Sequence, residues 1–223
     1  MNIIKGLIIK DLLQLKSYKK TLIMFIMIFL ITSLTQENVE DVNILIIMLT
    51  LGFGMFSIAT FNYDEQAKAD RYILTLPLTK KDIVLSKYIL VICSTIVGAI
   101  LGMIASFVII FAMSKEMINI KDMISLGLGG ILGIGIVEAI QIPCIYKWGA
   151  ERGRIQLLIV VAIITLLVGG LFFLGDKMNI NLEENCVIDM LNNFLPIILV
   201  AITAIIYYFS YKVSYKIYSK KEI

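Results

Sequence analysis

Long apolar runs recur along this chain and restrict its fold more than any other feature. The mean hydropathy is +0.92 and 59% of the residues are hydrophobic, whereas an average soluble domain holds about 45–50%. Several runs reach the roughly 18 residues with which a helix, rising about 1.5 Å per residue, crosses a bilayer core. Membrane β-strands would instead alternate polar and apolar residues over about ten positions. The sequence therefore predicts an all-α, polytopic membrane protein, with a single domain over residues 1–223.

Six transmembrane helices and one surface helix are predicted. Residues 2–18 place apolar and charged side chains at helical spacing, which favours an N-terminal interfacial helix over a plain cytoplasmic cap on the first span. The polar residues 175–193 have the spacing of a short amphipathic helix, either on the outer surface or re-entering the membrane. The predicted spans cover residues 19–35, 42–63, 83–113, 123–146, 155–174 and 194–211.

The distribution of basic residues predicts the orientation in the membrane. With both termini in the cytoplasm, that side holds all but Lys115, Lys121 and Lys177 of the 20 Lys and Arg residues, as the positive-inside rule requires. We therefore expect a multi-pass protein of a bacterial cell membrane. The net charge of +3 reflects this asymmetry and gives no reason to invoke nucleic acid.

Catalytic and cofactor sites find little support in the sequence. Histidine is absent, which removes the commonest general base and metal ligand, and the three cysteines suggest no disulfide framework. No phosphate-loop pattern G-x-x-x-x-G-K-[ST] occurs, so the chain is not expected to bind ATP in that way. An intramembrane enzyme would need paired acids, and Glu138 is the only one offered. We assign no catalytic, cofactor-binding or metal-binding residues.

Small residues recur every fourth position in the third predicted span, at Ser94, Gly98, Gly102 and Ser106. Such a line lets helix backbones approach closely where lipid supplies no hydrophobic force between helices. We expect it to pack the third span on the fourth within one chain, rather than to form a seam between two copies.

One carboxyl group lies within an apolar run, at Glu138, with Gln141 on the same helical face one turn further on. A buried carboxylate in a membrane usually faces a bundle interior, a partner or a water-filled path. Two interpretations stay open here. Glu138 and Gln141 line a substrate path, or Glu138 is a packing residue paired with Lys147 or a neighbouring span.

Residues 62–82 form a polar segment between the second and third spans, which we expect to be a coupling segment. Acidic residues at its start favour a helix beginning near Asp64, and Thr79 has the position of an N-cap for the next helix. Ile73, Leu74 and Leu76 would add an apolar surface for a partner protein; a solvated connector is the alternative. The residues predicted to contact a partner are Asp64, Glu65, Asp70, Arg71, Tyr72, Leu74, Leu76 and Pro77.

Two stretches carry a family resemblance. FNYDEQAKADRYILTLPLTKKDIVLSKY, residues 61–88, resembles the segment after the second span in permease subunits of type-2 ATP-binding-cassette (ABC) transporters. IPCIYKWGAERGR, residues 142–154, is similar to the family's stretch after the fourth span, with Trp148 in place of Phe and Arg152 in place of Lys. Both lie at predicted cytoplasmic ends, and the six-span layout covers the whole chain.

The resemblance implies half of an ATP-driven exporter. Two permease copies, identical or paralogous, would form the translocation path in the lipid bilayer. Each would dock a separate ATPase, which binds ATP and Mg, through the coupling residues. Similar compact permeases export amphipathic peptides such as phenol-soluble modulins, toxins or antimicrobial peptides. The alternatives are a secondary transporter or channel that works without an ATPase, for which no inverted repeat is apparent, and a membrane immunity protein.

Overall fold

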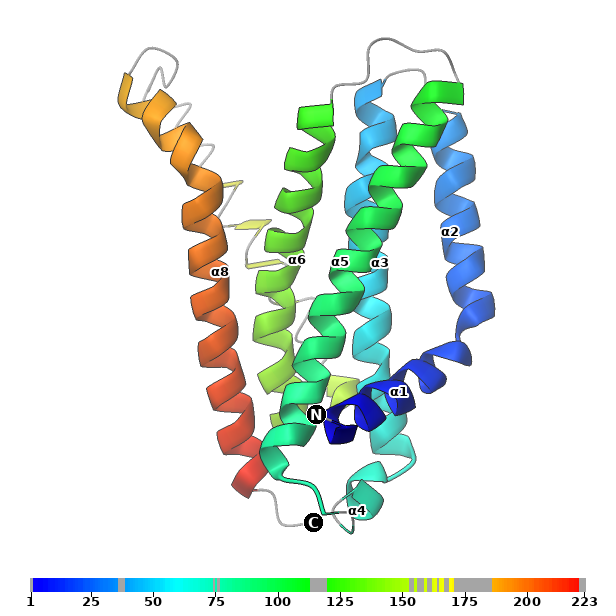
Figure 1. The fold of residues 1–223 in the computed structure, drawn as a ribbon, viewed down its shortest axis with the longest axis vertical. Coiled ribbons are helices and arrows are strands. Elements are labelled where there is room, and N and C mark those ends of the chain that lie inside the picture. The colour runs from blue at the N-terminus through cyan, green and yellow to red at the C-terminus, as the bar shows by residue number, and fades with distance from the viewer. Residues whose placement is uncertain are drawn as a thin grey trace.

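A computed structural model shows that all the regular structure among the described residues is helical (Figure 1). The described residues are 2–35, 39–73, 75, 77–112, 120–152, 155, 159, 162–163, 165–166, 169–170 and 186–220. The description covers the backbone alone at residues 2–3, 39–41, 70–71 and 186–196.

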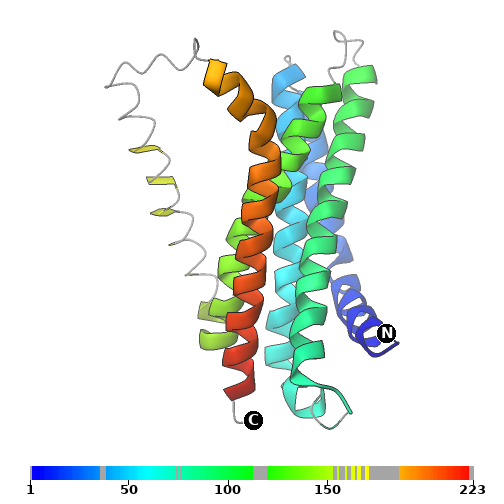
Figure 2. The same ribbon diagram turned by 60° about the vertical axis from the view of Figure 1, so that its left-hand side comes forward.

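Seven named helices follow one another in the described part of the chain, and most run along one direction of the bundle (Figures 1 and 2). They are α1 (Asn2–Lys16), α2 (Lys19–Leu34), α3 (Val39–Gln66), α4 (Ala69–Ile73), α5 (Lys80–Ala112), α6 (Ile120–Trp148) and α8 (Cys186–Lys220).

Four of these helices contain segments long and apolar enough to cross a membrane: Val42–Gln66, Lys80–Ala112, Ile120–Trp148 and Ile197–Lys220. Together α1 and α2 give a fifth candidate, bent by 67° between them. The chain is therefore a multi-pass membrane protein with four or five candidate spans among its described residues. Most of the span predicted at residues 155–174, and the whole segment 175–185, lie outside those residues.

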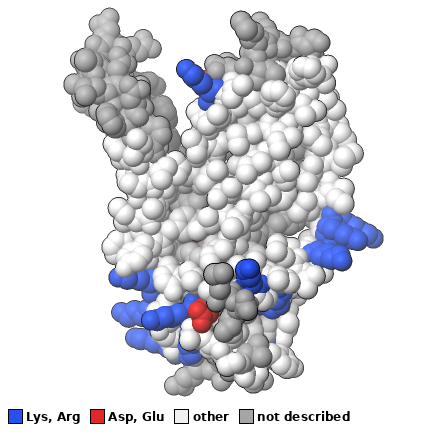
Figure 3. Space-filling view, viewed as in Figure 1, with Lys and Arg blue, Asp and Glu red and all other residues white. Residues whose placement is uncertain are grey.

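One end of the bundle gathers the chain termini and most of the described charges. The start of α1 and the end of α8 both lie at this end, on different sides of it, and α4 lies between the ends of α3 and α5 (Figures 1 and 2). On the face drawn in Figure 3, Lys and Arg side chains collect around this end, while the flank of the bundle is almost free of charge. We call it the basic end. A membrane core would surround the uncharged flank, because charged side chains are costly in hydrocarbon.

The line of small residues in α5 packs against α3, so the expected partner, the fourth span, was wrong. A Cβ atom built on Gly102 would lie 2.7 Å from Ile46 Cα of α3, and one on Gly98 would lie 2.8 Å from Leu49 O. Ser106 continues the contact, donating a hydrogen bond of 3.2 Å to the Val42 carbonyl. The spacing identified the face of α5 but held no information about which helix covers it.

We predict that Gly102→Ala will destabilise the protein by about 1–3 kcal/mol, because the added methyl group must displace the α3 backbone. Gly129→Ala is the matched control, since no atom lies within 4 Å of a Cβ built there. Thermal unfolding in detergent compares the two variants with the original chain. Equal midpoints for both variants would contradict the close α3–α5 contact.

Candidate functional site

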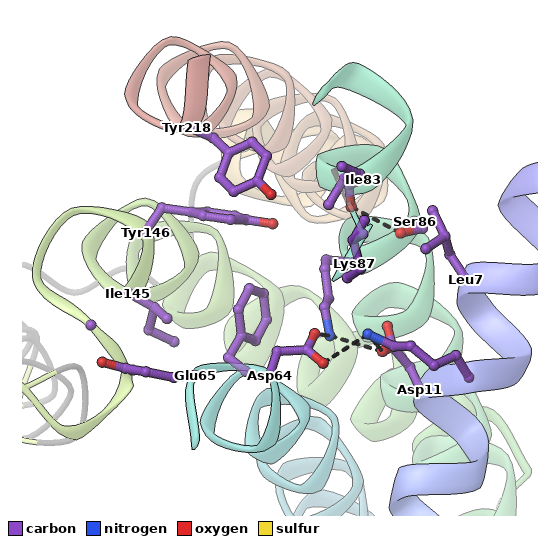
Figure 4. A pocket seen from close by; sticks show the side chains of 14 residues that line it. Leu7, Asp11, Asp64, Glu65, Ile83, Ser86, Lys87, Ile145, Tyr146 and Tyr218 are labelled. Carbon is purple, nitrogen blue, oxygen red and sulfur yellow. Dashed lines mark hydrogen bonds and ion pairs between the residues drawn. The ribbon is translucent and has the colours of Figure 1, made fainter. Parts of the chain in front are cut away.

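Four charged side chains from three helices meet at the basic end (Figure 4). Lys87 Nζ of α5 lies 2.6 Å from Asp64 Oδ2 of α3 and 3.0 Å from Asp11 Oδ1 of α1. Lys10 Nζ of α1 lies 2.7 Å from Asp64 Oδ1 and 3.0 Å from Asp11 Oδ1. Burial opposes the charge on Lys10, but the two carboxylates outweigh it and raise the pKa of Lys10. We call these four residues the charge cluster.

The charge cluster is largely shielded from solvent. The side chains of Asp11 and Lys87 are 1% and 6% exposed, and that of Asp64 is 13% exposed. Lys87 also donates a hydrogen bond of 3.1 Å to the Thr60 hydroxyl, and its ammonium lies 5.0 Å from the centre of the Phe61 ring. A buried charge is costly unless an opposite charge and hydrogen bonds satisfy it. Each member of the cluster therefore depends on the others.

The acidic pair Asp64 and Glu65 lies in the last turn of α3, whereas the sequence predicted that the pair would begin a docking helix. The helix continues to Gln66, and the Asp64 carboxylate is paired with lysines of α1 and α5. The chain leaves α3 at Lys68, whose φ of +48° is uncommon for a residue other than glycine. Asp64 precedes this turn, and its ion pairs with Lys10 and Lys87 place its carboxylate in the charge cluster.

Glu65 joins the two stretches on which the family resemblance rests. Its Oε2 accepts a hydrogen bond of 2.6 Å from the Ala150 backbone N–H, just beyond the end of α6. Gly149 lies between the end of α6 and Ala150. It has a φ of +88° and its N–H donates a hydrogen bond of 2.8 Å to the Ile145 carbonyl. A Cβ at Gly149 would lie 2.7 Å from Glu65 Oε1. Both the left-handed backbone and the close carboxylate therefore require glycine there.

The short helix α4 offers one prominent side chain. Tyr72 is 74% exposed, and Pro77 beyond the helix is exposed too. Ile73 is only 6% exposed and belongs to the core of the basic end, so its expected role in a partner-facing apolar surface was wrong. The remaining predicted contact residues have no described side chain: Asp70, Arg71, Leu74 and Leu76.

The start of α5 is fixed by the N-cap that the sequence predicted. The Asp82 N–H donates to Thr79 Oγ1 at 3.3 Å, and the Thr79 N–H donates to Asp82 Oδ2 at 3.3 Å. This reciprocal pair is the capping-box arrangement, with Asp in place of Glu. Lys80 adds a hydrogen bond of 3.0 Å from its Nζ to the Ser219 carbonyl of α8. The first turn of α5 is therefore tied to the end of α8.

Glu138 and Gln141 both lie inside the bundle, 2% and 5% exposed. Glu138 Oε2 accepts a hydrogen bond of 3.0 Å from the Tyr207 hydroxyl of α8. Its Oε1 occupies the space that Gly54 of α3 leaves, since a Cβ on that glycine would collide with it. Lys147, the alternative partner that the sequence suggested, has its ammonium 4.4 Å from the centre of the Trp148 ring.

Sequence reasoning missed the partners Lys10, Asp11, Lys87 and Tyr207. Lys87 carried a usable signal, because it stands among apolar residues that the start of a transmembrane helix would bury. The pairings themselves left no trace at neighbouring positions, since Lys10 and Asp64 are 54 positions apart and Tyr207 and Glu138 are 69 apart.

Comparison with known proteins gives a family match. A sequence model of the family described as "ABC-2 family transporter protein" matches residues 6–219. Searches of curated proteins and of solved structures gave no significant match. In the described part of the chain, no group of three or more Cys, Asp or Glu residues is placed to hold a metal ion.

We predict that Lys87→Met will lower the free energy of unfolding by about 3–5 kcal/mol, because it leaves two buried carboxylates facing Lys10 alone. The double variant Asp64→Asn/Lys87→Met will lose less than the sum of the single losses, since Lys10 and Asp11 still pair. Chemical unfolding in detergent, followed by circular dichroism, measures the three values. Lys81→Met, at an exposed position of the same helix, α5, is the control. Strictly additive losses would contradict mutual dependence in the charge cluster.

Gly149→Ala is expected to destabilise the basic end by about 1–2 kcal/mol, the cost of a left-handed backbone for a residue with a Cβ, with the displacement of Glu65 in addition. The thermal midpoint reports the loss. Gly133→Ala is the control, because a Cβ built there meets nothing within 4 Å and alanine favours a helix. Unchanged stability in Gly149→Ala would contradict the described loop geometry.

Proposed function

Because the chain belongs to the ABC-2 family of transporter proteins, we propose that it is the permease subunit of an ATP-driven exporter. It docks a separate ATPase at the basic end, and that ATPase binds ATP and Mg and performs the hydrolysis. The permease spans a bacterial cell membrane with both termini in the cytoplasm. The crowding of basic residues at the end where α1 begins and α8 ends (Figures 1 and 3) supports this orientation.

The observation that carries the docking proposal is the exposure of Tyr72 on α4. This short helix lies at the extremity of the basic end, between the ends of α3 and α5 (Figure 1). A tyrosine that is 74% exposed places a large amphipathic ring in solvent, and such rings are enriched at the centre of protein interfaces. Tyr72 and Pro77 would contact the ATPase directly, and the sequence adds Asp70, Arg71, Leu74 and Leu76 as further proposed contacts.

Asp64 and Glu65 have a different role in this proposal. Asp64 is held in the charge cluster with α1 and α5, and Glu65 holds the backbone beyond α6. A force applied to α4 therefore reaches α3 and, through these two carboxylates, three further elements. We propose that these carboxylates transmit the movement of the ATPase and that Tyr72 receives it.

The translocation path involves two permease copies, identical or paralogous. Glu138 and Gln141 would line it where it passes through the interior of each copy, because both are buried there. An amphipathic peptide is the proposed cargo. The buried carboxyl and amide groups inside otherwise apolar helices support a path that passes polar groups, because such side chains are rare in membrane spans unless they serve one.

We predict that Tyr72→Asp will lower the amount of ATPase retained by the purified permease at least tenfold. A charged side chain in place of a buried interface anchor costs about 2 kcal/mol or more, and 1.4 kcal/mol is a factor of ten in affinity. The measurement is the ratio of phosphate-loop ATPase to tagged permease after affinity purification from cells that express the full complex.

Ser219→Asp is the control. This serine is also exposed, but it lies among the basic residues at the end of α8 and not on α4. The control variant should retain the ATPase at the original ratio. If the original permease captures no ATPase, the proposed function is wrong; if Tyr72→Asp captures as much as the original, the docking site is wrong.

A further inference from the structure

The outer face of α1 is apolar, and no described residue covers it. Ile9, Leu12 and Leu13 lie at helical spacing and are 56%, 53% and 61% exposed. The opposite face of the helix packs against α3 and α5, where Leu7 and Asp11 are buried. Contiguous apolar surface of this kind marks a place where a protein meets another protein or a membrane.

Exposed lysines flank this apolar face on both sides. Lys5 precedes it by one helical turn, Lys16 follows it by one turn, and Lys19 and Lys20 begin α2 beyond the bend of 67°. Figure 3 shows basic side chains projecting from the bundle at the junction of α1 and α2. We call this area the bend surface; it consists of Lys5, Ile9, Leu12, Leu13, Lys16, Lys19 and Lys20.

No exposed acid neutralises the bend surface. Asp11 is the only Asp or Glu in residues 1–36, and it is buried and pairs inward with Lys10 and Lys87. Among the described residues, the four lysines of the bend surface form no ion pair with acids of other helices. Neighbouring like charges repel one another, so this surface favours an anionic partner.

The apolar surface continues along α2, beyond the bend. Ile23, Met24 and Met27 are 58%, 60% and 51% exposed, on the flank of the bundle that carries almost no charge (Figure 3). The bend surface therefore lies at the boundary between an apolar flank and the basic end. At the same boundary a bilayer passes from hydrocarbon to phosphate and headgroup charges, where amphipathic helices lie in the membrane plane.

We propose that the bend surface binds anionic phospholipids of the bilayer. Their acyl chains cover Ile9, Leu12 and Leu13, and their phosphate and headgroup charges pair with the lysines. A water-soluble acidic partner would match the lysines but not the exposed apolar side chains. A bilayer of neutral lipids would cover the apolar side chains but supply no net counter-charge. Anionic lipid does both, because lysines near such a bilayer surface are attracted to it.

The inference goes beyond ATPase docking, because it concerns the lipids around each copy of the chain. Lys10 and Asp11, on the inner face of α1, belong to the charge cluster. Lipid on the outer face would therefore hold the same helix between the bundle and the bilayer surface.

Quenching of tryptophan fluorescence by brominated lipids measures which lipids contact α1. Leu13→Trp, in a background of Trp148→Phe that removes the only native tryptophan, gives a single reporter. The purified full chain is reconstituted in mixtures of phosphatidylcholine and phosphatidylglycerol, with one or the other brominated. The relative binding constant should favour phosphatidylglycerol by about threefold or more at low salt.

Two triple variants separate local lipid binding from the overall charge of the basic end. Lys16→Gln/Lys19→Gln/Lys20→Gln keeps the apolar face and should bring the relative binding constant close to one. Lys212→Gln/Lys216→Gln/Lys220→Gln is the matched control, since it removes the same charge from exposed positions of α8, and should leave the constant unchanged. If the first variant does not fold, about 1 M salt on the reporter chain should remove the preference by screening.

Three results would overturn the inference: equal quenching by the two lipids at low salt, a preference that survives both the loss of the three lysines and high salt, or an equal loss in the α8 control. Quenching by neither lipid would overturn it too, because another protein surface, such as a second copy, would then cover α1. ATPase capture judges the proposed function separately, and neither outcome there changes the lipid preference of the isolated chain.

Discussion

The pairing of Lys10, Asp11, Asp64 and Lys87 is the interaction on which the arrangement of the basic end depends. It is the only described contact between oppositely charged groups that joins α1, α3 and α5. It lies in the last turn of α3, just before the chain turns into α4. It also holds α1 against the bundle, although α1 and α2 meet at an angle of 67°. Taking any one charge away leaves the remaining charges only partly compensated, so the three helices keep their positions together.

The sequence predicted those features that depend on neighbouring residues. Apolar runs gave the helical class, Thr79 gave the start of α5, and the concentration of Lys and Arg matched one end of the bundle. The sequence did not predict features that depend on contacts between residues far apart in the chain. Asp64 was read as the beginning of a helix because an acid favours that position, but it lies in the last turn of α3, paired with lysines of α1 and α5. Likewise, the spacing of Gly98 and Gly102 revealed a close-packing face, and only the structure showed that α3 covers it.

For the polar groups inside the bundle, too, the sequence shows what depends on neighbouring residues and not what depends on distant ones. An acid within an apolar run marks Glu138 as unusual from the sequence alone, because water is absent from the membrane core and the group needs a partner from the protein. Which partner it finds cannot be read from nearby positions. Tyr207 lies 69 positions further along the chain in a helix whose own pattern is that of an ordinary span. The same tyrosine also lines an apolar groove between α5, α6 and α8.

The contact between Gly54 and Glu138 has a consequence for how related sequences should be compared. The carboxyl oxygen fills the volume that a side chain at position 54 would need, so a larger residue at 54 requires the Glu138 side chain to move. The side chains at the two positions are therefore coupled across α3 and α6. A relative that carries alanine or serine at 54 is expected to hold the residue at 138 in another side-chain conformation or to have a smaller residue there.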